Sequence, residues 1–252
     1  MRCGLDNFEM KTKRKVLITG ASRGIGKSIA ESFIKSEYEV FVGYNKSKRE
    51  AEELAIKPNV HAININIGST KSVNNAFDII ESSHGFIDIL VNNAGISQLK
   101  SFEDLDDEDW INMLSINLIG AFRCSKRALI KMRKNKYGKI INISSVGGQW
   151  GGVHQVHYAA SKAALINLTK SIAKKYSKYG IFTNAIAPGL VETDMTKDEL
   201  SNIDRQDLEN KIPLGRLGET SEIASLVLFL AQDGSYITGQ TLNINGGIYS
   251  NG

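Results

Sequence analysis

Cysteine and proline are scarce in this 252-residue chain, which has two cysteines, Cys3 and Cys124, and three prolines. Cys3 lies in a polar N-terminal stretch, so a disulfide with Cys124 is not expected and a reducing, cytoplasmic location is favoured. The few prolines and the lack of a Gly/Ser-rich run argue against a disordered chain. The hydrophobic content of 42% is instead sufficient for one large core.

Long apolar runs are missing as well. No stretch approaches the roughly 20 apolar residues of a membrane-spanning helix, which predicts a soluble protein with no membrane partner. Residues 1–14 show neither the apolar segment of a signal peptide nor the Ser/Arg-rich pattern of a transit peptide. They are expected to form a flexible tail, leaving residues 15–252 as a single domain.

The charge balance and the histidine pattern argue against two further classes. Lys and Arg number 31 against 27 Asp and Glu, and no basic stripe interleaved with aromatics is present, so no nucleic-acid partner is expected. The four histidines lack the spacing of zinc ligands, so no metal site is expected. His61 and His84 are expected to be surface residues.

Short apolar runs alternate with helical patterns along the rest of the chain. Strands are predicted at 15–19, 38–44, 60–65, 88–93, 139–145, 181–188 and 240–246. Helices are predicted at 26–36, 69–83, 107–135, 157–179 and 220–233. Because parallel strands need helical crossovers, this order indicates an α/β, doubly wound Rossmann-type fold, with a seven-stranded parallel sheet and helices on both faces. Ligands of such folds bind at the carboxyl ends of the strands.

The turn after the first predicted strand reads TGASRGIG (19–26). Gly20 permits a tight turn, Gly24 lets the backbone approach a phosphate, and Gly26 allows a helix to pack closely on the sheet. The N-terminus of the next helix supplies free N–H groups for a pyrophosphate. Glycine is common in ordinary turns, but a strand, a glycine turn and a helix in this order indicate a dinucleotide site.

The end of the second predicted strand distinguishes between the two nicotinamide dinucleotides. An acid there would bind the ribose 2′-hydroxyl of NAD, but NKS (45–47) occupies the place and Glu39 comes too early. With Arg23 in the glycine turn, these residues supply donors and positive charge for a 2′-phosphate, which favours NADP(H). The alternative is that basic residues 46–49 only form the solvated start of a helix.

The segment YAASK (158–162) places Tyr158 and Lys162 four residues apart in a predicted helix, on one face. A phenol with an ordinary pKa near 10 becomes a useful proton donor at neutral pH when a nearby ammonium stabilises the phenolate. Ser145 ends the predicted strand INISS (141–145), where its hydroxyl would polarise a substrate carbonyl. Each feature alone is common by chance.

Taken together, the motifs resemble those of the short-chain dehydrogenase/reductase family, and the resemblance covers about residues 15–249. The matching motifs, in the family's order and at its spacings, are TGASRGIG (19–26), NNAG (92–95), SINLIGAF (115–122), ISS (143–145), YAASK (158–162), APGLVETDM (187–195) and YITGQTLNINGG (236–247). So many motifs in register make the resemblance specific.

The resemblance implies a role for each matching residue. The residues implied to be catalytic are Asn117, Ser145, Tyr158 and Lys162. The residues implied to bind the cofactor are Gly20, Ser22, Arg23, Gly24, Ile25, Gly26, Asn45, Lys46, Ser47, Asn66, Ile67, Asn93, Ala94, Gly95, Tyr158, Lys162, Pro188, Gly189, Val191 and Thr193. In the family, the asparagine kinks a helix and holds a water of the proton relay. Asn66 stands where many members have aspartate.

Within the family, the C-terminal region 216–249 is most similar to that of the 3-oxoacyl-[acyl-carrier-protein] reductases of fatty-acid biosynthesis. This implies NADPH-dependent reduction of a 3-oxoacyl thioester, linked to acyl carrier protein or CoA, to the 3-hydroxyacyl product. One alternative is reduction of another ketone, such as a sugar, polyol, steroid or secondary-metabolite intermediate. The other is nucleotide binding without turnover, which the intact catalytic set argues against.

The predicted substrate entrance departs from those reductases. The segment 145–158 brings Trp150, His154 and His157 to a rim that is bulkier and more polar than a fatty-acid reductase is expected to have. The residues expected to contact the substrate are Ser145, Trp150, His154 and Gln155. Lys136 and Tyr179 stand where paired arginines would meet an acidic carrier protein, so a carrier partner is left open.

Assembly is implied by the resemblance, because relatives are commonly tetramers. A homotetramer would pack through helices 107–135 and 157–179 and the C-terminal strand region. The stretch SLVLFLA (225–231) is apolar almost all round, as a helix covered on more than one side should be, although core burial alone would explain it.

Overall fold

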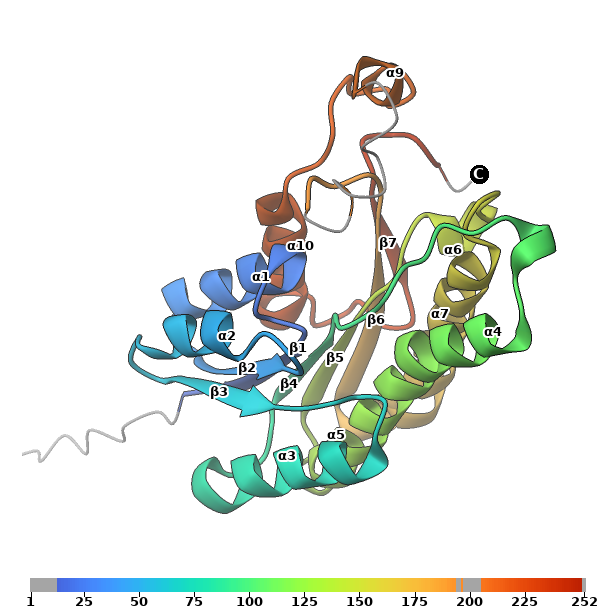
Figure 1. The fold of residues 1–252 in the computed structure, drawn as a ribbon. Coiled ribbons are helices and arrows are strands. Elements are labelled where there is room, and N and C mark those ends of the chain that lie inside the picture. The colour runs from blue at the N-terminus through green and yellow to red at the C-terminus, as the bar shows by residue number, and fades with distance from the viewer. Residues whose placement is uncertain (1–12, 194–195, 197–204, 251–252) are drawn as a thin grey trace, which may run out of the picture.

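The computed structural model describes residues 13–193, 196 and 205–250, which form three layers with a sheet in the middle (Figure 1). In these residues seven parallel strands are ordered β3-β2-β1-β4-β5-β6-β7. The strands are β1 (Lys15–Thr19), β2 (Glu39–Tyr44), β3 (Val60–Asn64), β4 (Ile89–Asn92), β5 (Gly138–Ile143), β6 (Ile181–Pro188) and β7 (Thr241–Ile244). The chain order reverses between β1 and β4, which confirms the predicted doubly wound fold.

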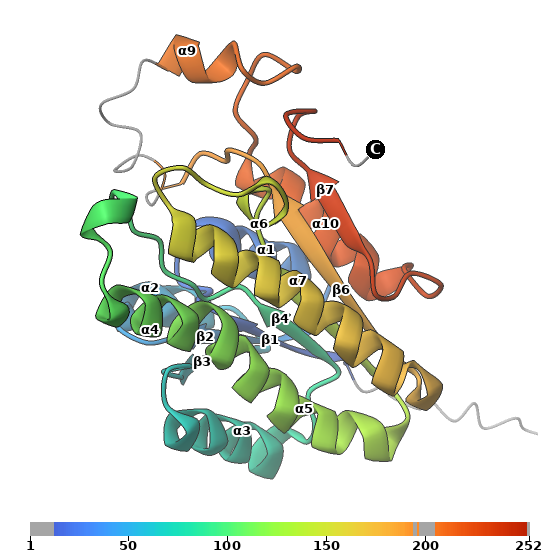
Figure 2. The ribbon, with the colours of Figure 1, turned by 90° about the vertical axis from the view of Figure 1, so that its right-hand side faces the viewer.

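Helices cover both faces of the sheet (Figure 2). One face carries α1 (Gly24–Lys35), α2 (Lys48–Ala55) and α10 (Thr220–Gln232); the other carries α3 (Thr70–His84), α5 (Ala121–Asn135) and α7 (Val156–Tyr176). Successive strand residues point to opposite faces, so Val16 and Ile18 join the first core and Leu17 joins the second. Almost every residue of the central strands β1, β4 and β5 is therefore buried, and most of them are apolar.

Shorter elements complete the described chain. They are the 3-10 turns η1 (Phe102–Asp104) and η3 (Ser177–Tyr179), the π-helical η2 (Ser115–Gly120), and the helices α4 (Asp107–Leu114), α6 (Gly147–Trp150) and α9 (Arg205–Glu209). None of the helices in the described ranges is long and apolar enough to cross a membrane.

The helices differ from the sequence prediction in several places, and the short helices α6 and α9 are not predicted. The helix expected over 107–135 is divided into α4, η2 and α5, because a π-helical stretch interrupts the regular hydrogen bonding. The patterns also do not predict α2, whose charged sequence KREAEELA buries only Ala51 and Leu54. Its exposed face carries the i,i+4 ion pairs Lys48–Glu52 and Arg49–Glu53, which favour a helix modestly.

Candidate functional site

The carboxyl ends of the strands surround a cavity of about 470 Å³ at the point where the strand order reverses. Every residue that the sequence implies to bind the cofactor lines this cavity, with the exception of Gly26. Of the implied catalytic residues, Ser145, Tyr158 and Lys162 line it as well. One cavity thus brings together motifs that lie more than 100 residues apart in the chain.

The glycine turn has the geometry that the sequence motif requires. Gly20 and Gly24 have φ angles of +65° and +53°, in the left-handed region that side chains other than glycine disfavour. Gly26 stands behind the cavity wall, where a Cβ would lie 2.2 Å from the carbonyl oxygen of Gly20. The turn therefore leads directly into α1, whose first N–H groups have no partner within the helix and suit a phosphate.

Asn93 fastens the glycine turn to the end of β4. Its Nδ2 donates to the carbonyl oxygens of Thr19 and Gly20, at 3.0 Å each. In return, the Thr19 hydroxyl accepts hydrogen bonds from the N–H groups of Asn93 and Ala94, at 3.1 Å each. These contacts explain why the second Asn of NNAG suits this position. Its side-chain amide reaches from the end of β4 to the end of β1 and donates two hydrogen bonds there.

The basic residues after β2 fall into two groups. Lys46 is exposed and, together with Arg23 from the glycine turn, lines the cavity. Lys48 and Arg49 do not line it, and they form the ion pairs along α2 described above. Lys48 and Arg49 therefore behave as the solvated start of a helix, while Lys46 and Arg23 are cations that line the cavity.

The end of β5 contacts the residues that the sequence predicts to be catalytic. Lys162 Nζ lies 5.6 Å from the centroid of the Tyr158 ring and donates to the Ile143 carbonyl oxygen at 2.9 Å. The hydroxyl of Ser144 donates to the backbone carbonyl of Lys162 at 3.0 Å, which joins the strand end to α7. Ser145 follows and accepts a hydrogen bond from the N–H of Gly147 at 3.1 Å. Tyr158, Lys162 and Ser145 thus all line the same cavity.

Lys162 is buried in the folded chain, with 5% of its surface exposed. Burial disfavours the ammonium and lowers the pKa of Lys162 from its ordinary value of 10.5 to about 8. The charge is still present at neutral pH, at a cost to stability. The unfolded chain binds this proton more tightly, so the cost exists in full below pH 8 and disappears as the pH rises from about 8 to 10.5.

Lys162→Met is expected to raise the melting temperature of the cofactor-free protein by about 2–5 °C at pH 7, after allowance for the hydrogen bond lost to Ile143. The difference from wild type should shrink as the pH is raised from 7 to 10, because the wild-type lysine loses its charge over that interval. Calorimetry of both proteins across this pH range measures the effect. A difference that grows with pH would contradict the assignment of a buried ammonium.

Asn117 lies in the π-helical η2 and is 1% exposed. Its Oδ1 accepts from the Ile96 N–H at 2.8 Å, and its Nδ2 donates to the Ile96 carbonyl at 2.9 Å and to Ser161 Oγ at 3.1 Å. A Cβ on Gly95 would lie 3.1 Å from Asn117 Oδ1 and 3.5 Å from Lys162 Nζ. Asn117 therefore stands directly behind the cavity and joins the interrupted helix to α7. Short π-helical stretches are frequent at functional sites.

His157 is not a rim residue, which corrects the sequence expectation. It is fully buried, and its Nε2 lies 2.9 Å from Gln98 Oε1. Desolvation lowers the pKa of His157 below its ordinary 6.5. Adjacent residues of a helix differ by about 100° in direction, so His157 turns towards Trp110 of α4, 6.1 Å between ring centroids, while Tyr158 faces the cavity.

The other residues expected to contact the substrate lie outside the cavity wall. Trp150 is 50% exposed and packs edge-on against Tyr249, with ring centroids 5.9 Å apart. His154 is exposed, and Gln155 Nε2 donates to Ser97 Oγ at 2.9 Å. Of the four residues expected to contact the substrate, Ser145 alone lines the cavity, so Trp150, His154 and Gln155 can meet only the parts of a substrate that extend beyond it.

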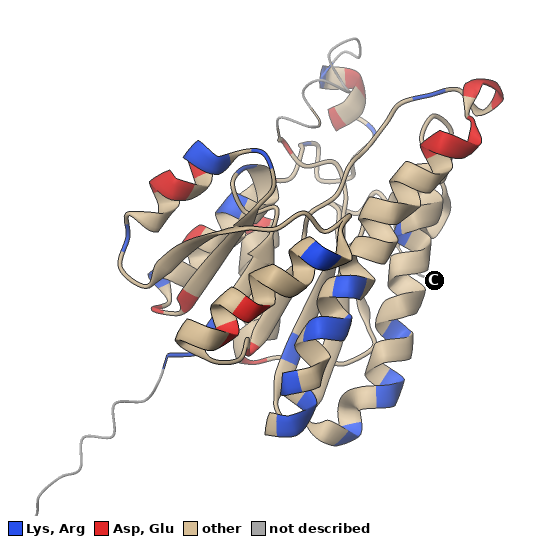
Figure 3. Cartoon of the chain, turned by 60° about the horizontal axis from the view of Figure 1, so that its bottom comes forward, with Lys and Arg blue, Asp and Glu red and all other residues tan. Residues whose placement is uncertain are grey.

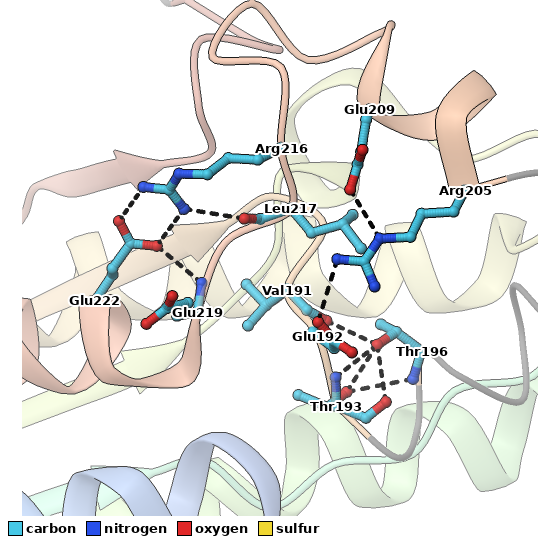
Figure 4. Close-up of polar contacts among 10 residues, drawn as sticks. All are labelled: Val191, Glu192, Thr193, Thr196, Arg205, Glu209, Arg216, Leu217, Glu219 and Glu222. Carbon is cyan, nitrogen blue, oxygen red and sulfur yellow. Dashed lines mark hydrogen bonds and ion pairs between the residues drawn. The ribbon is translucent and has the colours of Figure 1, made fainter.

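The segment after β6 forms another wall of the cavity. Figure 4 shows the polar contacts within it. Thr196 Oγ1 donates to the Val191 carbonyl at 2.7 Å and accepts from the Thr193 N–H at 2.9 Å. Beside it, Arg205 Nη2 lies 3.5 Å from Glu192 Oε2, an exposed pair that contributes little to stability. Residues 194–195 of the motif APGLVETDM lie outside the described residues.

The cavity also contains residues that the sequence analysis does not assign. They are Tyr44, Ile65, Ile96, Ile116, Ile143, Ser144 and Thr196. Tyr44, Ile65, Ile143 and Ser144 end or directly follow strands, so their place in the fold is a signal that could have identified them. Ile116 and Thr196 offer no such signal.

Comparison with known proteins agrees with this arrangement. Residues 20–249 match the family model described as Enoyl-(Acyl carrier protein) reductase. The chain is 44% identical to the 3-oxoacyl-[acyl-carrier-protein] reductase FabG of Aquifex aeolicus, over 96% of this chain and 100% of the relative. It is 41% identical to the FabG proteins of Staphylococcus aureus, over 95% of this chain and 100% of the relative, and of Escherichia coli, over 96% and 99%. The chain belongs to the short-chain dehydrogenase/reductase family.

Proposed function

We propose that this protein is an NADPH-dependent reductase that converts a 3-oxoacyl thioester to the 3-hydroxyacyl product. The observation that carries the proposal is the meeting of Ser145, Tyr158 and Lys162 in the same cavity as the glycine turn. The curated relatives, similar over nearly their whole length, are 3-oxoacyl-[acyl-carrier-protein] reductases. An intact catalytic set makes nucleotide binding without turnover the weaker explanation.

The residues of the cavity fit NADPH. The glycine turn leaves no space for a Cβ at Gly26 and brings the start of α1 to the cavity, where it suits the pyrophosphate. Arg23 and Lys46 supply positive charge at the place of the 2′-phosphate, and no acid of the described chain lines the cavity. NADPH, when bound, supplies the hydride that reduces the carbonyl carbon.

The protein's own residues supply the proton and hold the carbonyl. Tyr158 donates the proton of its hydroxyl to the substrate oxygen, and the ammonium of Lys162 stabilises the phenolate that remains. The Ser145 hydroxyl donates a hydrogen bond to the same oxygen, which favours the negative charge that develops there. Asn117 and the Ile143 carbonyl keep Lys162 and the helix that carries it in place.

A second candidate is reduction of another ketone, such as a cyclic ketone or a keto sugar. It is favoured by the exposed Trp150 and His154 at the entrance, which differ from the small, apolar rim expected for a fatty-acid reductase. A third candidate, suggested by the description of the matching family model, is reduction of an enoyl thioester. The curated relatives are 3-oxoacyl-[acyl-carrier-protein] reductases, which favours reduction of a ketone over that chemistry.

A substrate panel separates these candidates. NADPH oxidation is measured with acetoacetyl-CoA, acetoacetyl-acyl-carrier-protein, crotonoyl-CoA, cyclohexanone and a keto sugar. We expect kcat/KM for the two acetoacetyl thioesters to exceed that for the other compounds by roughly tenfold or more. A preference for cyclohexanone or the sugar would support the second candidate, and a preference for crotonoyl-CoA would support enoyl reduction.

An acidic carrier protein is the proposed partner. Lys and Arg gather along α5 and α7 (Figure 3). Near the ends of these helices, Arg133 and Lys178 lie over the Tyr179 ring, at 5.5 and 5.3 Å from its centroid. Position 179, where an arginine is expected, thus holds a tyrosine ring with Arg133 and Lys178 close to it. A lower KM for the carrier-linked substrate than for acetoacetyl-CoA in the panel would support docking at this surface.

A cytoplasmic homotetramer is the proposed working state. Apolar side chains that one chain leaves exposed follow the face of the interrupted helix: Ile111 is 66% exposed, Phe122 45% and Ile130 59%. Phe229 of α10 is 44% exposed, so the apolar stretch 225–231 is not covered on all sides by its own chain. Contacts between subunits would bury these residues.

A further inference from the structure

Two histidines and a glutamate meet at the edge of the sheet opposite the cavity. Glu39 begins β2, His61 lies in β3, and His84 is the last residue of α3. Glu39 Oε1 lies 2.6 Å from His84 Nδ1 and 3.2 Å from His61 Nε2, and one potential ligand atom from each residue lies within 4.8 Å of the others. The described chain holds no other group of three such ligands.

The fold positions these side chains independently of the catalytic site. Phe41 pairs in register with His61, and its buried ring packs against both imidazoles, with centroid distances of 5.0 Å to His61 and 5.2 Å to His84. Gly85, with φ of +85°, ends α3 directly after His84. Tyr44, at the cavity, lies five positions along β2 from Glu39, which corresponds to about 16 Å.

The ligand set and the spacing suit a small transition-metal ion. Zinc bonds of about 2.0–2.1 Å in a tetrahedron place ligand atoms about 3.3 Å apart. The His61–Glu39 separation of 3.2 Å matches this value, the His84–Glu39 separation of 2.6 Å would have to widen, and all three ligand atoms lie within 4.8 Å of one another. Two imidazoles and a carboxylate suit zinc better than magnesium or calcium, which take oxygen ligands. The three side chains are 17–32% exposed, which leaves an entry path and room for a water as fourth ligand.

We propose that Glu39, His61 and His84 bind one divalent transition-metal ion, Zn²⁺ in the first place, as a structural site. The ion would join the edge strand β3 and the end of α3 to β2, and so stabilise the part of the sheet that has no neighbour beyond β3. The proposal departs from the expectation of no metal site, which considered histidine spacing along the chain. The pairing of β2 with β3 and the position of the end of α3, not sequence spacing, bring these ligands together.

Metal binding is tested on untagged, cofactor-free protein with Cys3→Ser as background, which removes that thiol as a competing ligand. Zn²⁺ binding is measured by competition with a chromogenic chelator, and Co²⁺ is used as a spectroscopic probe of geometry. We expect one ion per chain and the intense visible bands of four-coordinate Co²⁺. Absence of stoichiometric binding in this protein would overturn the proposal without recourse to any variant.

Variants then assign the ligands. His61→Gln, His84→Gln and Glu39→Gln are each expected to weaken Zn²⁺ binding by about 100-fold or more, while His154→Gln, at the exposed rim, should bind as wild type does. In Zn²⁺ at about 100 times its Kd, the melting temperature should rise by about 5–10 °C in wild type and not in His84→Gln. Binding that survives all three substitutions would overturn the site. His84→Gln should retain NADPH oxidation, so failure of this proposal and failure of the proposed reductase activity are distinguishable.

Discussion

Tyr158→Phe is expected to lower kcat for NADPH oxidation by about 10²–10⁴-fold, because it removes the proton donor and leaves the ring in place. The Kd for NADPH should change little, since the hydroxyl is one of many groups that line the cavity. Stopped-flow measurement of turnover and fluorescence titration of NADPH separate the two effects. Loss of kcat without loss of binding is the pattern of an interaction made in the transition state.

A matched control lies on the same helix. Tyr176 ends α7, about 27 Å along the helix from Tyr158, and Tyr176→Phe removes an equivalent hydroxyl without touching the cavity. This control should keep wild-type turnover. If Tyr158→Phe retained more than about a tenth of wild-type kcat, Tyr158 would not be the proton donor.

The fold was predictable because its pattern is local. Buried parallel strands are recognised as short apolar runs, and the helices between them by the helical period of their apolar residues. Each element can therefore be predicted from a window of about 5–20 residues. The interruption of helix 107–135 was not visible in this way. Asn117 requires partners at Ile96 and Ser161, 21 and 44 residues away, and those contacts select the π-helical geometry.

The residues of the site that lie at the ends of strands could be predicted from the sequence, and those at its rim less well. Tyr158 and Lys162 share a helix face by their spacing alone, and the glycine turn has a backbone requirement that only glycine meets. His157 was misplaced because its burial depends on where α4 packs. In the sequence, Glu39 was considered only as a ligand of the cofactor ribose, for which it comes too early in the strand. Its contacts to His61 and His84 could not be predicted, because they arise from strand register and from the position of the end of α3.

Lys46→Glu is expected to raise the KM for NADPH by about 10–100-fold and to leave the KM for NADH unchanged or lower. Lys46 lines the cavity beside Arg23, and a charge-assisted hydrogen bond to a phosphate contributes about 1.5–3 kcal/mol. A carboxylate in its place would repel the 2′-phosphate and could accept a hydrogen bond from the 2′-hydroxyl of NADH. Initial rates with both cofactors measure the change, and wild type should show a much lower KM for NADPH than for NADH.

Lys48→Glu tests whether Lys46 acts through its position or through charge alone. Both substitutions change the net charge equally and lie two residues apart, but Lys48 points along α2, where its Nζ lies 3.4 Å from Glu52 Oε1, and it does not line the cavity. If Lys46 contacts the 2′-phosphate directly, Lys48→Glu should leave the ratio of the KM for NADPH to the KM for NADH within about twofold of wild type. The reason is that surface charges at a distance are screened by salt. If Lys46→Glu and Lys48→Glu changed the KM values equally, Lys46 would not contact the 2′-phosphate directly. Equal KM values for NADPH and NADH in wild type would also contradict such a contact. In either case a preference for NADPH would need another origin.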